Sequence, residues 1–293
     1  MAVTLEASRR GGSLKEIWNQ FKQASRLGWL IESNWADPFV FAVYSLIRPL
    51  STALILVFMY LVVVRGSTSN PFFVHLYIGN AFFMYAGRVM MGISYAIIDD
   101  REHYEMLKYI YISPLRIFVF LLGRGVAQVI ATTISVLIIL LLGLWPLGIR
   151  IPWGSVNWML FLVSFPLGIV TISFMGYLLA GLVLVLARHA WPIAEGVAAV
   201  LYVVSGAIFP IDVLPGWVQV ISRAIPLTYW LELLRRSLLG SSFSPAFNSM
   251  ATWELFLWFL GLTLLFGVSG YLVFQRMNRV ARQRGMIDQI TGY

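Results

Sequence analysis

The chain has 293 residues, of which 59% are hydrophobic and 12% are charged. A soluble domain is nearer half apolar and about a quarter charged, so this composition excludes an ordinary soluble globular protein and indicates a polytopic membrane protein. The net charge of +8 suits basic cytoplasmic loops better than nucleic-acid binding, and the absence of cysteine excludes disulfides and thiolate chemistry.

The first element expected is an amphipathic helix between residues 14 and 35. Apolar residues recur there at three- and four-residue spacing, and the opposite face carries lysine, glutamine and arginine. A polar stretch precedes the first long apolar run, so no cleavable signal peptide is expected. We expect residues 1–37 to form a cytoplasmic tail whose helix lies in the membrane interface, because the sequence offers no soluble domain against which it could pack.

Six apolar segments follow, at residues 40–64, 72–98, 116–144, 157–187, 192–209 and 252–275. An even number of spans places both ends of the chain on one side. Thirteen of the 21 lysines and arginines fall on that side, which marks it as cytoplasmic. We therefore predict an all-α protein with a six-helix domain at 38–275 and a basic cytoplasmic tail at 276–293. It would be a multi-pass protein of the cell membrane, plasma or inner, with both termini cytoplasmic.

The outer connection between the fifth and sixth spans is long, apolar and interrupted by proline. No full span fits between Pro210, Pro215 and Pro226, because each proline breaks a helix. One short helix is expected to begin at Pro215, to carry Trp217 and to stop at Pro226. A second short helix is expected to follow, with Gly240 as its left-handed cap. We expect the pair to form a re-entrant hairpin that dips into the outer leaflet.

The connection between the second and third spans is the most charged short segment, and we expect it to stay helical until Pro114. A polar helix at this cytoplasmic tip is placed to dock on a soluble partner, although any loop between spans must be polar. An alternative is that Asp99 and Asp100 bind magnesium and a diphosphate, as in membrane prenyltransferases. Those enzymes need a second aspartate-rich motif, and the other aspartates of this chain are isolated.

Three charged residues, Arg88, Arg124 and Glu195, fall within or near the ends of predicted spans, where charge is costly. They could line a substrate route, the arginines favouring an anionic or phosphate-bearing headgroup, or form an internal ion pair. A secondary carrier would need ion-coupling carboxylates at mid-membrane, and Glu195 is the one candidate. The three histidines show no metal-ligand spacing, so no metal site is expected.

A nucleotide-binding loop needs glycine before its lysine and serine or threonine after it, so that backbone amides and the ammonium hold the phosphates. The chain has three lysines, Lys15, Lys22 and Lys108, and none of them follows a glycine. We therefore expect ATP and Mg, if they are used, to be bound by another polypeptide.

Two outer stretches, SGAIFPIDVLPGW at 205–217 and IPLTYWLELLR at 225–235, resemble the most recognisable part of the ABC type 2 transporter permeases. The run from Glu102 to Pro114 resembles the "E-x-x-x-G-T-x-E … S-P" stretch of the same family. His103, Tyr104 and Glu105 stand where a Gly-Thr pair is common. The resemblance also includes the amphipathic helix and the six-span layout.

The resemblance implies the permease subunit of an exporter for drug-like, lipid or glycolipid substrates, with no cofactor of its own. Its partners would be a second permease copy, identical or paralogous, and two ATP-binding subunits, all within membrane lipid. Segment 99–112 would be the coupling helix, with contacts from Glu102, Tyr104, Glu105 and Lys108. The 210–240 hairpin would form an outer gate that includes Phe209, Pro210, Pro215, Trp217, Pro226, Glu232 and Arg235.

Overall fold

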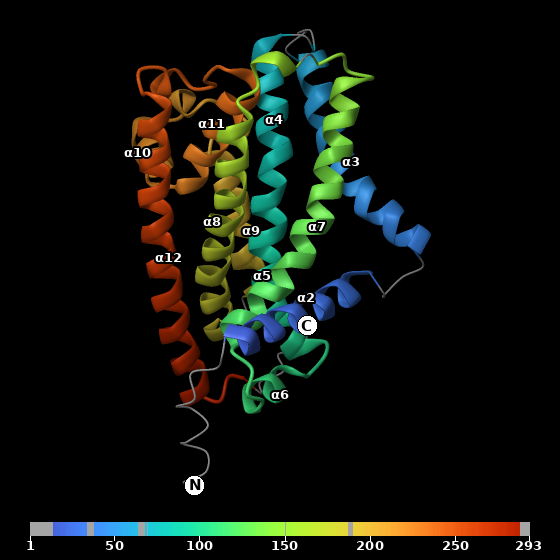
Figure 1. The fold of residues 1–293 in the computed structure, drawn as a ribbon, viewed down its shortest axis with the longest axis vertical. Coiled ribbons are helices and arrows are strands. Elements are labelled where there is room, and N and C mark those ends of the chain that lie inside the picture. The colour runs from blue at the N-terminus through green and yellow to red at the C-terminus, as the bar shows by residue number, and fades with distance from the viewer. Residues whose placement is uncertain are drawn as a thin grey trace.

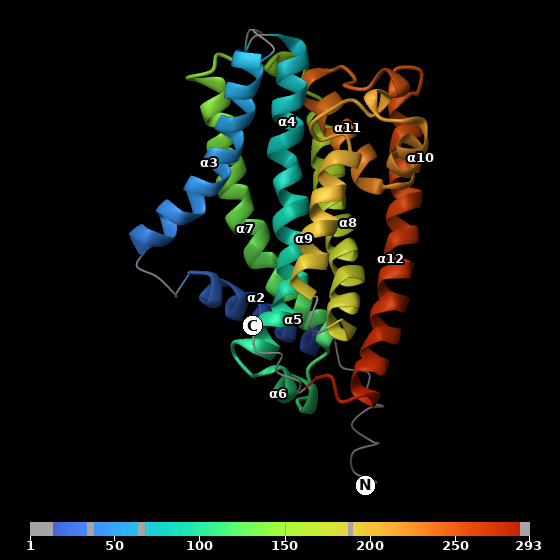
Figure 2. The same ribbon diagram turned by 180° about the vertical axis from the view of Figure 1, so that it is seen from behind.

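The computed structural model describes residues 14–33, 38–63, 68, 70–149, 151–186 and 190–287. Within these ranges the chain is all-helical and contains no strand, which confirms the all-α part of the predicted fold class. Figures 1 and 2 show long helices standing side by side, one helix lying across them near one end, and short helices gathered at the other end. Residues 1–13 and 34–37 of the predicted N-terminal segment 1–37, and residues 288–293 of the predicted tail 276–293, lie outside the described residues.

Four helices of the described chain are long and apolar enough to cross a membrane. They are the continuous rod Pro71–Glu102, α7 (Ile117–Leu144), α8 (Trp158–Val185) and α12 (Thr252–Gln283). The rod consists of α4 (Pro71–Tyr85), a π-helical turn η1 (Ala86–Met90) and α5 (Met91–Glu102). The chain is thus a multi-pass membrane protein, and these helices match four of the six predicted spans.

The helix starts follow from capping chemistry. The Asn70 side chain accepts the Phe72 amide at 2.9 Å and Pro71 occupies the first helical position, where a missing amide hydrogen costs nothing. The Asn157 side chain likewise accepts the Leu160 amide at 3.0 Å at the start of α8. Both caps lie at the same end of the bundle, where the short helices gather.

The remaining two predicted spans correspond to α3 (Pro38–Val63) and α9 (Ala190–Val204). α9 has 15 residues, or about 22 Å at ~1.5 Å per residue, and so falls short of the ~30 Å hydrocarbon layer. It ends earlier than the predicted span 192–209, because the chain turns at Gly206, whose φ is +76°. The six-span count therefore remains a prediction.

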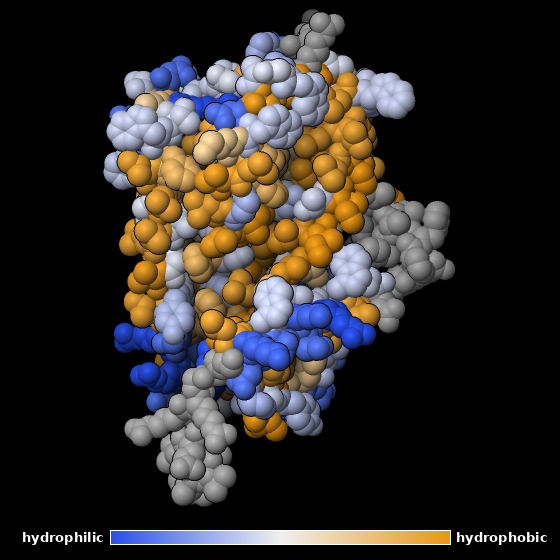
Figure 3. Space-filling view, viewed as in Figure 1, coloured by the Kyte–Doolittle hydropathy of each residue, from blue (hydrophilic) through white to orange (hydrophobic). Residues whose placement is uncertain are grey.

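The amphipathic helix exists as α2 (Leu14–Ser33) and packs across one end of α7 (Figure 1). The sequence predicts that this end faces the cytoplasm, and we call it the inner end and the opposite end the outer end. The two backbones approach closely, because a Cβ on Gly123 would lie 2.5 Å from the Cβ of Ala24. Lys15, Trp18 and Lys22 are exposed on the surface of α2. Figure 3 shows this hydrophilic strip directly below a broad apolar band, as expected for a helix at a membrane surface.

At the opposite end the chain forms η4 (Ile211–Val213), α10 (Gly216–Ala224), α11 (Pro226–Leu239) and η5 (Pro245–Phe247). As predicted, α10 ends before Pro226, and Gly240 caps α11 in the expected left-handed conformation with φ +71°. α11 packs against α4, α8 and α12, so the long helices enclose it. We call residues 210–250 the outer cap.

Candidate functional site

A cavity of about 590 Å³ runs along one face of the rod made by α4, η1 and α5. The rod residues that line it recur at three- and four-residue intervals from Asn80 to Asp99. At ~1.5 Å per residue this lining extends about 28 Å along the rod. Residues of α2, α3, α7 and α9 complete its walls. We call this cavity the groove.

The two halves of the groove differ in chemistry. Its outer half is lined by apolar residues and by an Asn80–Tyr202 pair, in which the tyrosine hydroxyl donates to the asparagine carbonyl oxygen. Its inner half holds most of the polar side chains of the lining: Glu32, Tyr95, Asp99, Arg124, Gln128 and Glu195. The groove thus offers a polar end near the inner side of the bundle and an apolar length above it.

The three charges singled out in the sequence, Arg88, Arg124 and Glu195, all line the groove. The ion-pair partner of Arg124 is Asp100, because Arg124 Nη2 lies 3.6 Å from Asp100 Oδ1. Glu195 Oε1 accepts a hydrogen bond of 2.8 Å from the Tyr95 hydroxyl. Their role in a substrate route stays a prediction.

Sequence reasoning missed Glu32 and Gln128, which meet across the groove wall where the Gln128 Nε2 donates to Glu32 Oε2 at 2.8 Å. Glu32 lies in the last turn of the amphipathic helix, and Gln128 lies inside a predicted span. The sequence did contain an indication that Gln128 lies in the same site as Arg124, because the two residues are four positions apart and share one face of α7.

Buried charges lie behind the inner end of the groove. Asp100 is fully buried, and neither carboxylate oxygen has a hydrogen-bond donor among the described residues. Arg124 is 7% exposed, and its Nη1 has no acceptor among them. The pair is therefore held by charge without a direct hydrogen bond, and one guanidinium nitrogen of Arg124 stays buried without an acceptor among the described residues.

The magnesium alternative is not supported by this arrangement. Asp100 faces Arg124, whereas Asp99 Oδ1 lies 3.5 Å from His103 Nδ1, so the two carboxylates have separate partners. The described residues contain no group of three or more side chains able to hold a metal. A metal–diphosphate site would need additional oxygen ligands here.

The prediction of a continuous coupling helix across 99–112 is wrong. α5 ends at Glu102, and a separate short helix, α6, spans Leu107–Ile112. Between them Glu105 adopts a left-handed conformation with φ +48°. The turn allows Leu107 and Ile110 to be buried at 1% and 6% exposure, whereas a straight helix would carry them away from the bundle. We call residues 103–115 the cytoplasmic tip, after the side of the membrane on which the sequence predicts them to lie.

Three of the four predicted coupling residues are exposed on this tip: Tyr104, Glu105 and Lys108. The fourth is not, because the Glu102 side chain is 3% exposed and accepts the Arg101 Nε at 2.8 Å. Nearby apolar side chains are exposed as well, with Ile112 at 82%. The tip thus presents a mixed charged and apolar surface.

The cytoplasmic tip is tied to two other helices. The Tyr111 hydroxyl donates to Asn278 Oδ1 at 2.8 Å, and the Arg282 guanidinium lies 4.8 Å from the Tyr111 ring, so α6 is fixed to the inner end of α12. Burial raises the pKa of Tyr111 to about 12, and Arg282 partly offsets this. The Arg116 amide donates to Gln20 Oε1 at 3.2 Å, which joins the segment after the tip to α2.

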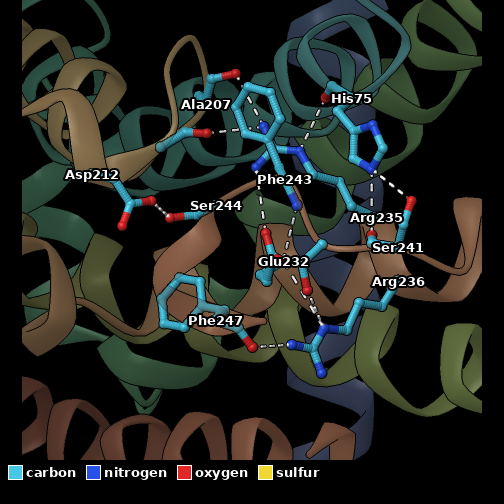
Figure 4. A network of polar contacts seen from close by, with 12 residues as sticks. His75, Ala207, Asp212, Glu232, Arg235, Arg236, Ser241, Phe243, Ser244 and Phe247 are labelled. Carbon is cyan, nitrogen blue, oxygen red and sulfur yellow. Dashed lines mark hydrogen bonds and ion pairs between the residues drawn. The ribbon is translucent and has the colours of Figure 1, made fainter. Parts of the chain in front are cut away.

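The outer cap is fixed by a fully buried arginine (Figure 4). Arg235 donates to the carbonyl oxygens of His75 at 3.0 Å, Gly206 at 2.9 Å and Ala207 at 3.2 Å. Burial lowers the pKa of Arg235 to about 10, and Glu232 opposes this shift. One side chain thereby joins α11 to α4 and to the turn after α9.

Glu232 is the carboxylate of this cluster. It is 1% exposed, accepts the Phe243 amide at 3.1 Å, and lies 4.0 Å from Arg235 and 3.9 Å from Arg236. Burial raises the pKa of Glu232, and the neighbouring arginine and hydrogen bonds oppose that effect. Figure 4 shows these side chains meeting at the base of the loop that follows α11.

The other residues of the predicted gate differ in their exposure to solvent. Pro210 and Pro226 are buried, whereas Phe209, Pro215 and Trp217 are exposed on the outer surface. The predicted gate did not include Trp230, which is fully buried and whose Nε1 donates to the Ser164 carbonyl at 3.0 Å.

A family model described as "ABC-2 type transporter" matches residues 19–239. The match extends from α2 to the last residue of α11, and so includes the groove, the cytoplasmic tip and most of the outer cap. None of the curated proteins compared with the chain matches it.

Proposed function

The chain belongs to the ABC-2 type transporter family, and from this premise we propose that it forms one membrane half of an ATP-driven exporter of amphipathic substrates. It is a permease subunit. In the proposed assembly a second permease copy, identical or paralogous, completes the membrane part. Two ATP-binding subunits supply ATP and Mg, and the permease itself carries out no covalent chemistry.

The groove is the observation that carries the proposal. Its polar inner half and apolar outer half match a molecule with a headgroup and a hydrophobic body. Small-molecule sites have volumes of roughly 300–1,000 Å³, and the groove lies within that range. A substrate entering from the cytoplasmic leaflet would place its polar end beside Tyr95 and Asp99 and its apolar part beside Phe83.

The cytoplasmic tip is suited to contact an ATP-binding subunit. Tyr104, Glu105 and Lys108 offer charge and hydrogen bonding, and the exposed Ile112 offers an apolar anchor. Since α6 is bonded to α12 through Tyr111 and Asn278, a force on the tip would reach a 32-residue helix directly. This is the connection that an alternating-access mechanism requires.

The outer cap would act as the gate on the opposite side. It covers the outer ends of the long helices and is fastened through Arg235 to α4 and to the turn after α9. Because α9 also supplies Glu195 and Tyr202 to the groove, a tilt of α9 would move the groove wall and the base of the cap together. We propose this shared helix as the link between substrate and gate.

The proposal is tested by co-expressing the chain with a candidate ATP-binding subunit and purifying through a tag on the permease. Vanadate-sensitive ATP hydrolysis is then measured for the wild type and for the charge reversals Glu105→Lys and Lys108→Glu. Reversal of the exposed Arg223, Arg223→Glu, on the outer cap is the matched control. We expect the tip reversals to abolish co-purification and the control to retain it. Equal co-purification of all three variants would contradict the proposed contact.

A further inference from the structure

Among the residues that the structure describes, the inner half of the groove carries more negative than positive charge. Its carboxylates come from three separate helices, Glu32 of α2, Asp99 of α5 and Glu195 of α9. Two arginines line the groove, and Arg124 is already compensated by the buried Asp100 at 3.6 Å. Field lines from like charges concentrate in a low-dielectric cavity, so this balance favours a cationic group in the ligand.

A pair of aromatic rings lies beside one of these carboxylates. The Tyr95 ring stacks on Trp191 with centroids 5.0 Å apart and an interplanar angle of 26°, while its hydroxyl donates to Glu195 at 2.8 Å. Trp191 is 56% exposed, so part of its ring remains accessible. A carboxylate next to aromatic rings attracts an ammonium both by charge and by the cation–π interaction.

Arg124 provides a second and independent observation. Its side chain is 6% exposed and lines the groove, and its Nη1 lacks an acceptor among the described residues. A buried donor without a partner carries a desolvation cost, which a ligand oxygen would remove.

We infer that the groove binds an amine-bearing amphiphile, whose ammonium lies at Glu195 and the Tyr95–Trp191 rings and whose headgroup oxygen accepts from Arg124 Nη1. The apolar part extends along the outer half, past Phe83. This assignment rests on the proposed function and names its substrate class. It replaces the anionic headgroup suggested by the arginines alone, because the structure brings three carboxylates to the same cavity.

The test uses the purified full chain in lipid nanodiscs, with empty nanodiscs as background. The probe is tritiated N-dodecylethanolamine, which carries an ammonium, a hydroxyl oxygen and an alkyl chain. Competitors with the same chain are dodecyl phosphate and the neutral dodecylglycerol. The probe makes one charge-assisted contact that dodecylglycerol cannot make, and dodecyl phosphate carries the opposite charge. We therefore expect both competitors to bind at least about tenfold more weakly than the probe.

Two substitutions examine the ammonium end. Glu195→Gln keeps the shape of the side chain, and we expect it to weaken probe binding about tenfold while leaving dodecylglycerol unchanged. Tyr95→Phe keeps the stacked ring and removes one hydrogen bond, for which we expect about threefold weakening. Glu16→Gln, at an exposed carboxylate of α2 outside the groove, is the matched control and is expected to bind as the wild type does.

A third comparison examines the oxygen end. Wild-type protein should bind N-dodecylethanolamine about threefold more tightly than dodecylamine, which lacks the oxygen. Arg124→Lys retains a cation opposite Asp100 but removes the guanidinium nitrogen, so the two amines should bind this variant equally. An oxygen preference that survives in Arg124→Lys would overturn the assignment of Arg124.

Tighter binding of dodecyl phosphate than of the amine, or an unchanged affinity in Glu195→Gln, would overturn the inference. Since the assay contains no ATP-binding subunit, its result is separate from that of the proposed function. A complex that hydrolyses ATP but does not prefer the amine would refute the substrate class alone. Amine binding by a chain that recruits no ATP-binding subunit would refute the exporter proposal alone.

Discussion

Arg235 occupies the space that a side chain at Gly79 would need, because a Cβ built on Gly79 would lie 1.7 Å from Arg235 Nη2. Because Gly79 has no side chain, α4 has a notch at this position, and the guanidinium of Arg235 from α11 fits into it. From this notch Arg235 reaches the carbonyl oxygens of Gly206 and Ala207. The position of the outer cap thus depends on glycine at residue 79 as well as on arginine at residue 235.

We expect Gly79→Ala to destabilise the protein by about 1–3 kcal/mol, because Arg235 must shift and its buried nitrogens then lose acceptors. Thermal unfolding of the purified chain in detergent measures the change. Gly261→Ala is the matched control, since a Cβ there meets nothing within 4 Å on the exposed face of α12. Equal melting temperatures for the two variants would contradict the notch.

Because Arg124 and Asp100 form an ion pair behind the groove, we expect substitutions at these two residues to have non-additive effects on the free energy of unfolding. Arg124→Gln should cost about 3–5 kcal/mol, because it leaves Asp100 charged, buried and without its arginine. Adding Asp100→Asn to that variant should restore much of the loss, since the uncompensated charge disappears. A double-mutant cycle of unfolding free energies checks this. Strictly additive effects would show that the two side chains do not interact.

Membrane topology can be mapped directly, because the chain contains no cysteine. A membrane-impermeant maleimide applied to intact cells should label Ser155→Cys, which lies in the exposed outer connection between α7 and α8. Lys22→Cys on α2 and Tyr109→Cys on the cytoplasmic tip should react only after permeabilisation. Labelling of either inner position in intact cells would reverse the predicted orientation.

The contact between α6 and α12 predicts a dependence on alkaline pH. Burial raises the pKa of Tyr111 from the ordinary value of 10.0 to about 12, so the folded protein holds this proton more tightly than the unfolded chain. Stability from this group is present below pH 10 and is lost as pH rises from about 10 to about 12. Wild-type stability should therefore fall relative to Tyr111→Phe over that interval. A constant difference between them would contradict the burial of this hydroxyl.

Local chemistry explains which parts of the fold the sequence could predict. Proline and glycine act on the backbone within a few residues, so the boundaries of α11 at Pro226 and Gly240 were predictable. The break before α6 was not, because its left-handed residue is Glu105, a type with no preference for that conformation. The early end of α9 was also missed, since apolar residues continue past it to Phe209.

The candidate site shows the same division. Arg88, Arg124 and Glu195 were recognisable individually, because any charge inside an apolar segment is costly and therefore conspicuous. Their cavity was not, since Glu32 lies in a helix outside the predicted spans and joins them only because α2 crosses the inner end of α7. Sequence position carries no information about this crossing.

The sequence by itself determined that the chain is helical and embedded in a membrane. The length of each apolar segment and the placement of charges determine how a helix partitions between lipid and water, and this needs no tertiary contact. It also determined the family, through an ordered set of outer and cytoplasmic motifs. Only the tertiary structure decided which charges share the groove and that Arg235 fills the notch at Gly79. These are relationships between side chains from different helices, and helix packing alone sets the distances between them.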